Sequence, residues 1–88
     1  MAWTVEFQKS AAKQLRALDQ TVQRRILRYL RERVLAADDP RKFGKALRGD
    51  KGDLWRYRVG DYRIICGLED ELLLILVIEV GHRREIYR

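Results

Sequence analysis

The sequence predicts an α+β fold: a helical hairpin packed on one face of a small, mostly antiparallel four-stranded sheet, in the order β-α-α-β-β-β. Two observations predict it. Along the chain, the spacing of apolar residues changes from every second residue to helical spacing and back. The C-terminal strands are separated by turns so short that neighbouring strands can only run antiparallel. The length of 88 residues predicts a single domain over residues 1–88.

The N-terminal half predicts one strand and two helices. Apolar and polar side chains alternate over residues 2–7, which is typical of a strand with one buried face. From Gln8 the apolar residues follow helical spacing, and Asp19 stands where the N-cap of a second helix belongs. We expect that helix to reach about Ala37, because Pro40 disfavours helical geometry in the residue before it.

The C-terminal half predicts a loop and three strands. Residues 40–52 contain several glycines and show no clear period, so they are interpreted as a loop. The strands are expected at residues 54–59, 62–68 and 72–80. The last of these is the most apolar, and we therefore expect it in the centre of the sheet.

Composition narrows the classes of function. The formal net charge of +6 and the isoelectric point near 9.9 favour a polyanionic partner, of which nucleic acid is the commonest. A single cysteine cannot form an internal disulfide, and neither a signal peptide nor a membrane span is recognisable, so a cytoplasmic location is expected. One histidine and one cysteine cannot make a zinc site, and phosphate-binding glycine motifs are absent. We expect no metal and no cofactor.

Strand alternation places three arginines on one face of the sheet. Trp55 and Tyr57 share the face that packs on the helices, so Arg56 and Arg58 project from the opposite, open face. Arg63 on the next strand is expected beside them, within cross-strand or diagonal reach. Like charges repel, so a bound anion would offset the cost of gathering them. Any one of these arginines, taken alone, is more simply explained as a solvent-exposed residue without a functional role.

The tail at residues 81–88 is expected to emerge beside this cluster. His82 is the only histidine, and imidazole is the side chain that ordinarily titrates near neutral pH. Tyr87 is suited to stacking on a base, and Arg83 or Arg84 to binding a phosphate. The simpler alternatives are that His82 is a loop histidine without a functional role and that Tyr87 anchors the end of the chain.

The segments LRG (47–49), YRVGDYRI (57–64) and VGHRREIY (80–87) resemble the RelE/ParE superfamily, and the RelE family of type II toxin–antitoxin toxins in particular. The resemblance covers essentially the whole chain. It implies a metal-independent, ribosome-dependent endoribonuclease that cleaves mRNA in the ribosomal A site. It also implies a cognate antitoxin protein as partner, with operator DNA bound only through the toxin–antitoxin complex.

Carried over by position, the family's catalytic residues fall on the whole cluster and on part of the tail. They correspond to Arg56, Arg58, Arg63, Arg83 and Tyr87, with His82 as the candidate general base. A second set is expected to contact RNA, namely Lys45, Arg48 and Arg84.

The chain departs from several relatives at two catalytic positions. Those relatives carry lysine where Arg56 and Arg58 stand, and arginine keeps its proton near neutral pH. We therefore expect these two side chains to bind phosphate and stabilise the transition state, which leaves the base open. The alternatives are a ParE-like toxin that binds DNA gyrase without nuclease activity, and an inactive homologue that only binds antitoxin. A basic helical surface is either solvated or contacts ribosomal RNA or antitoxin: Lys13, Arg16, Arg24, Arg25, Arg28 and Arg31.

Overall fold

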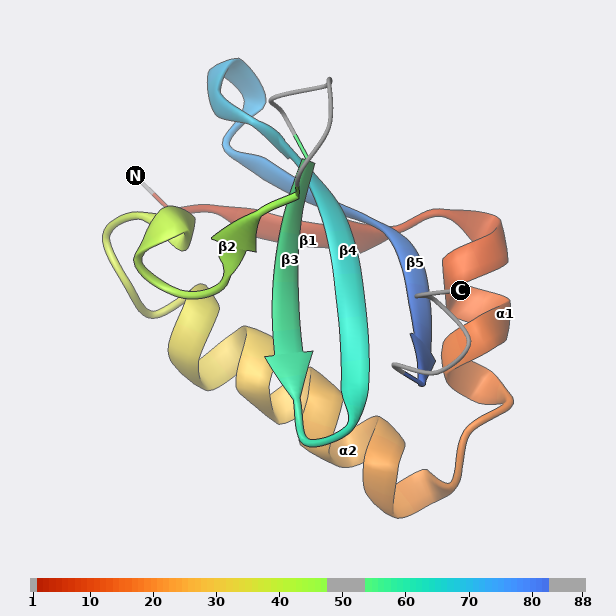
Figure 1. Ribbon diagram of the computed structural model, residues 1–88. Helices are drawn as coiled ribbons and strands as arrows, with labels where there is room; N and C mark the ends of the chain where they lie inside the picture. Colours follow the sequence, from red (N-terminus) through yellow and green to blue (C-terminus); the bar gives the residue numbers. More distant parts are fainter. Residues whose placement is uncertain (1, 48–53, 83–88) are drawn as a thin grey trace.

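The computed structural model describes residues 2–47 and 54–82, as two helices packed on a sheet (Figure 1). The strands are β1 (Thr4–Phe7), β2 (Lys45–Ala46), β3 (Leu54–Val59), β4 (Tyr62–Glu69) and β5 (Leu74–His82). The helices are α1 (Lys9–Arg16) and α2 (Gln20–Tyr29), and α2 continues into a wider π-type turn at Leu30–Val34. Short 3₁₀ turns lie at Pro40–Lys42 and Asp70–Leu72.

The strand order is β1-β5-β4-β3-β2, and this confirms the α+β class with one correction. The sheet has five strands instead of four, because Lys45 and Ala46 in the expected loop pair with Arg56 and Trp55 of β3. All neighbouring strands are antiparallel except β1 and β5, which are parallel. The sequence predicts strand β5 in the centre of the sheet. It is an interior strand between β1 and β4, but the central strand of the five is β4.

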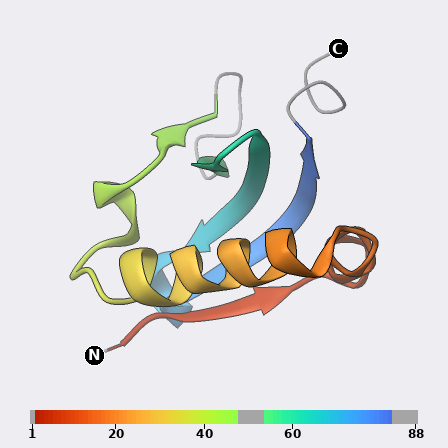
Figure 2. The ribbon, with the colours of Figure 1, turned by 90° about the horizontal axis from the view of Figure 1, so that it is seen from below.

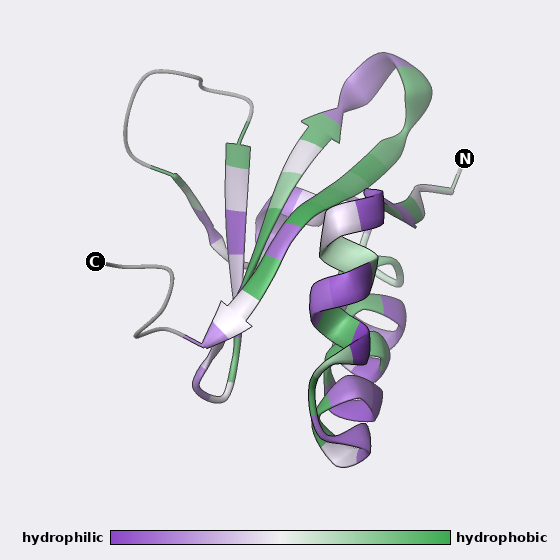
Figure 3. Cartoon of the chain, turned by 90° about the vertical axis from the view of Figure 1, so that its right-hand side faces the viewer, coloured by the Kyte–Doolittle hydropathy of each residue, from purple (hydrophilic) through white to green (hydrophobic). Residues whose placement is uncertain are grey.

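Both helices lie on the same side of the sheet (Figure 3). Seen from below, α2 runs across the view whereas α1 is seen nearly end-on, so the two helices are steeply inclined to each other (Figure 2). None of the described helices is long and apolar enough to cross a membrane. The buried core fills the space between helices and sheet, and its members are Ala11, Leu15, Ile26, Leu30, Val34, Tyr57, Ile64, Cys66, Leu68, Ile75, Val77 and Val80.

The second helix begins as predicted and ends earlier. The Asp19 carboxylate accepts a hydrogen bond of 3.0 Å from the backbone N–H of Thr21, which confirms the predicted N-cap. The backbone N–H of Leu35 donates to the carbonyl oxygen of Leu30 at 2.8 Å, which closes the π-type turn. The helical segment therefore stops before the predicted Ala37, and Pro40 instead begins a separate 3₁₀ turn.

The turn between β4 and β5 is longer than predicted. Strand β5 begins at Leu74 and not at Leu72, whose side chain is 68% exposed. Leu73 adopts φ = 51°, in the left-handed region, and its N–H donates to the carbonyl oxygen of Asp70 at 3.2 Å. This backbone geometry closes the turn and moves the start of the strand by two residues.

A β-bulge in β5 decides which of its side chains share a face. Cys66 pairs with Val77 and the preceding Ile65 pairs with Glu79, so Ile78 has no partner in the β4–β5 register. Val77 and Val80 consequently both belong to the buried core, although strict alternation would separate them. From the bulge to the end of the strand, every side chain therefore lies on the face opposite to the one that strict alternation predicts.

Candidate functional site

The β3–β4 hairpin positions the candidate arginines. Gly60 lies in its turn with φ = 60°, a left-handed conformation that glycine adopts without strain. Tyr57 pairs with Ile64, and both side chains are fully buried against the helices. Residues at alternate positions therefore lie on the opposite face, where Arg56 pairs with Ile65 and Arg58 with Arg63. The structure brings the three predicted arginines onto one face.

The arginines differ in exposure. Arg58 is exposed, whereas Arg63 is only 4% exposed. The expectation that Arg63 projects openly from the sheet is wrong, because its side chain is almost completely buried. Its partner on β5 is Gly81, which contributes no side chain to the shared face. A cation held there is pre-positioned and partly desolvated, which strengthens its attraction for an anion.

The face of the sheet that carries Arg56, Arg58 and Arg63 is called the basic face. Lys45 extends it by one strand. It is exposed and lies directly opposite Arg56 in the β2–β3 pair. The close approach of β2 depends on Gly44, where φ is 73°. A Cβ at Gly44 would collide with the carbonyl oxygen of Arg56 and lie 2.8 Å from the Tyr57 ring. The short strand that sequence analysis interpreted as loop therefore positions a predicted RNA-binding residue.

Glu79 is a candidate site residue that sequence analysis missed. It pairs with Ile65, on the face that carries Arg58 and Arg63, and lies two residues from Gly81, the partner of Arg63. That spacing makes Glu79 a diagonal neighbour of Arg63 across the two strands. The bulge at Ile78 brings this carboxylate to the basic face.

His82 lies on the other face. It pairs with Tyr62, and the two rings meet edge to face with centroids 5.3 Å apart. Tyr62 packs against the core beneath the helices, so strand alternation separates His82 from Arg58 and Arg63. Its role as a general base stays a prediction. Arg48, Arg83, Arg84 and Tyr87 lie outside the described residues.

Neither thiol chemistry nor metal binding is suggested by the described side chains. Cys66 is fully buried, and this burial raises the pKa of its thiol to about 12. Cys66 is a free cysteine. Within residues 2–47 and 54–82, no three His, Cys, Asp or Glu residues gather into an arrangement that could hold a metal ion.

Comparison with known proteins establishes the family. The model of the ParE toxin of type II toxin–antitoxin systems matches residues 5–87. Toxin RelG of Mycobacterium tuberculosis is 33% identical over 78 residues, covering 77% of this chain and 90% of RelG. The chain therefore belongs to the RelE/ParE family of type II toxins, as its motifs predict.

Solved structures share the fold. A mutant of the E. coli toxin RelE in the free state has a TM-score of 0.78 and 31% identity, covering 99% of this chain and 92% of RelE. The archaeal RelE–RelB complex from Pyrococcus horikoshii contains a chain with a TM-score of 0.74 and 32% identity. The match covers 94% of this chain and 97% of that one. A chain of the RelBE2 complex from Mycobacterium tuberculosis has a TM-score of 0.82 at 24% identity. The match covers 94% of this chain and 93% of that one.

Proposed function

We propose that this toxin is an endoribonuclease that acts on mRNA in the A site of the cytoplasmic ribosome, with cationic side chains balancing charge in place of a metal ion. The observation that supports the proposal most strongly is the shared face of Lys45, Arg56, Arg58 and Arg63 on three adjacent strands. Such a concentration of like charge opposes folding. A phosphodiester would offset that cost.

In the proposed reaction, the ribose 2′-OH attacks the adjacent phosphorus in line and the bond to the 5′-oxygen of the next nucleotide breaks. The products are a 2′,3′-cyclic phosphate and a 5′-OH end. Negative charge grows on the phosphoryl oxygens, and Arg56, Arg58 and Arg63 are proposed to stabilise it. Arg83 is proposed to assist the leaving oxygen, Tyr87 to stack on a nucleotide, and Arg48 and Arg84 to bind RNA.

The proton acceptor must be a group other than an arginine. His82 is one candidate, and Glu79 is the second, because the bulge in β5 places its carboxylate on the basic face. A chain with so few acid–base groups has to gain much of its rate from positioning of the RNA. That requirement agrees with a dependence on the ribosome, which orders the bases of the A-site codon.

An antitoxin is the expected protein partner. The similar chains from E. coli, Pyrococcus horikoshii and Methanococcus jannaschii are described in RelB–RelE toxin–antitoxin complexes. For this toxin we propose a cognate antitoxin that blocks activity, with operator DNA reached only through the complex.

One observation favours a second function. The matching family model is that of the ParE toxin, and ParE-like activity implies binding of DNA gyrase without RNA cleavage. Purified toxin separates the two when it is added in parallel to programmed ribosomes and to a gyrase supercoiling reaction. Cleavage in the A-site codon, with the two end groups named above, supports the nuclease. Inhibited supercoiling with intact mRNA contradicts it.

A further inference from the structure

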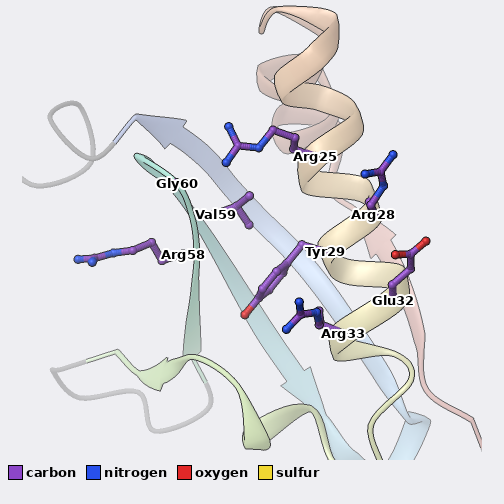
Figure 4. A pocket seen from close by; sticks show the side chains of 8 residues that line it. All are labelled: Arg25, Arg28, Tyr29, Glu32, Arg33, Arg58, Val59 and Gly60. Carbon is purple, nitrogen blue, oxygen red and sulfur yellow. The ribbon is translucent and has the colours of Figure 1, made fainter.

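A groove of about 420 Å³ separates α2 and its π-type turn from the end of β3 (Figure 4). Arg25, Tyr29 and Arg33 extend from the helical segment toward β3, and Arg28 and Glu32 lie on its outer flank (Figure 4). The opposite wall is Val59, Gly60 and Arg58, and the side chain of Arg58 points away from α2 toward the other face of the sheet (Figure 4). We call this feature the α2–β3 groove.

The groove is strongly cationic. Four arginines line it against a single glutamate. None of the four forms an ion pair or a side-chain hydrogen bond with another described residue, whereas Arg41 and Lys42 elsewhere do pair with aspartates. Arg25 also crosses toward the hairpin turn, since its Nη2 lies 3.2 Å from the position that a Cβ at Gly60 would take. Folding leaves these charges available to an anion.

The groove continues onto the basic face of the sheet. Tyr29 and Arg58 also line the adjoining pocket, together with Gly44, Lys45 and Arg56. One cationic surface thus runs from α2 around the edge of β3 to the arginines that we propose contact the cleaved phosphate. A surface of this length fits a chain of phosphates better than a single one.

Tyr29 gives the groove a fixed aromatic wall. Its ring packs edge to face on Phe43 and Tyr57, with centroids 6.4 and 6.2 Å away. Burial raises the pKa of Tyr29, so the hydroxyl keeps its proton and can donate to a phosphate or a base. Of the groove residues, Val59 alone is aliphatic, and this offers little anchorage to the apolar face of a peptide helix.

We infer that the α2–β3 groove is a second RNA-binding site, which takes the phosphodiester backbone outside the cleaved dinucleotide. The inference rests on the proposed nuclease function and extends its substrate from one codon to a longer stretch of RNA. Arg25 and Arg33 bind phosphates in this site, and Arg58 lies where the groove meets the basic face of the sheet.

The test compares two double variants in RNA binding. Arg25→Ala with Arg33→Ala removes the groove cations, and Arg24→Ala with Arg31→Ala removes two exposed arginines of the same helical segment that lie outside the groove. Alanine favours helix in both pairs, and circular dichroism checks the fold. The probes are an uncleavable 2′-O-methyl oligouridine of about twelve nucleotides and the corresponding trinucleotide.

The groove variant is expected to bind the long probe roughly ten-fold more weakly, with the slope of log K against log salt smaller by about 1.4 for two lost contacts. Binding of the trinucleotide is expected to stay unchanged, and the control pair should match wild type. Equal losses in both pairs, or no loss in either, would overturn the inference. The inference would also be overturned if the groove variant bound RNA as wild type does but no longer bound a glutamate-rich peptide. A wild type that binds both probes but leaves ribosomal mRNA uncut contradicts the proposed nuclease and not the groove.

Discussion

Arg58 on β3 lies directly opposite Arg63 on β4, so two cationic side chains face each other across neighbouring strands. Directly opposed like charges destabilise a sheet. Replacing Arg58 by glutamine keeps the length of the side chain and removes one charge, so we expect the free energy of unfolding to rise by about 0.5 kcal/mol. Urea denaturation at low salt measures it. A loss of stability would show that Arg58 holds the fold together and is not maintained there for a ligand.

The proton acceptor is identified by a pair of amide substitutions. Glu79→Gln and His82→Gln each remove a titrating group with little change in size. Because Glu79 shares the face of the arginines and His82 does not, we expect Glu79→Gln to slow ribosomal mRNA cleavage about 100-fold. His82→Gln should stay near the wild-type rate. The rate of mRNA cleavage by each variant is measured across a range of pH. If His82→Gln is the slower of the two, the proton acceptor is His82.

Tyr57 ties the sheet to the segment before β2. Its hydroxyl donates a buried hydrogen bond of 2.8 Å to the carbonyl oxygen of Pro40, and burial raises its pKa, so the donor stays protonated. Tyr57→Phe should lower the free energy of unfolding by about 1 kcal/mol, because the carbonyl loses its partner. Tyr62→Phe is the matched control, since Tyr62 is half-buried and donates no hydrogen bond to another described residue. Equal effects would refute the role given to the hydrogen bond.

An ion pair joins the Pro40–Lys42 turn to the β4–β5 turn. The two terminal nitrogens of the Arg41 guanidinium, Nη1 and Nη2, donate to the Asp70 carboxylate at 2.9 Å, and this lowers the pKa of Asp70. A lowered folded-state pKa stabilises the protein above the ordinary carboxyl pKa, and the stabilisation is lost as pH falls through the lowered value. Asp70→Asn should therefore lower Tm at neutral pH, and the difference should disappear as the pH falls through the lowered pKa of Asp70. A difference that persists in acid would assign the effect to packing.

Local pattern was sufficient to predict most of the fold. Alternation in β3 and β4 depends on each strand's own side chains, so the faces of Arg56 and Arg58 could be predicted. The pairing of Lys45 with Arg56 could not, because a strand of two residues has no period to recognise. The burial of Arg63 could not be predicted either, because alternation gives the face of a side chain and not what packs over it in the assembled fold.

The β5 bulge shows the limit of pattern most clearly. With strict alternation from Val77, His82 would lie on the basic face and Glu79 beneath the helices. The extra residue Ile78 reverses both placements. No residue type in the run from Leu74 to His82 marks that position, so only the observed register reveals which titrating side chain lies near the arginines.

The central claim is that the cationic face of β2, β3 and β4 cleaves RNA. Single-turnover cleavage of an A-site codon on programmed ribosomes tests it most directly, with Arg58→Gln compared with Arg24→Gln, whose side chain lies on α2 outside both pockets. The account predicts that Arg58→Gln folds normally and cuts at least about 100-fold more slowly, while Arg24→Gln cuts at the wild-type rate. Cleavage by Arg58→Gln at the wild-type rate would contradict it.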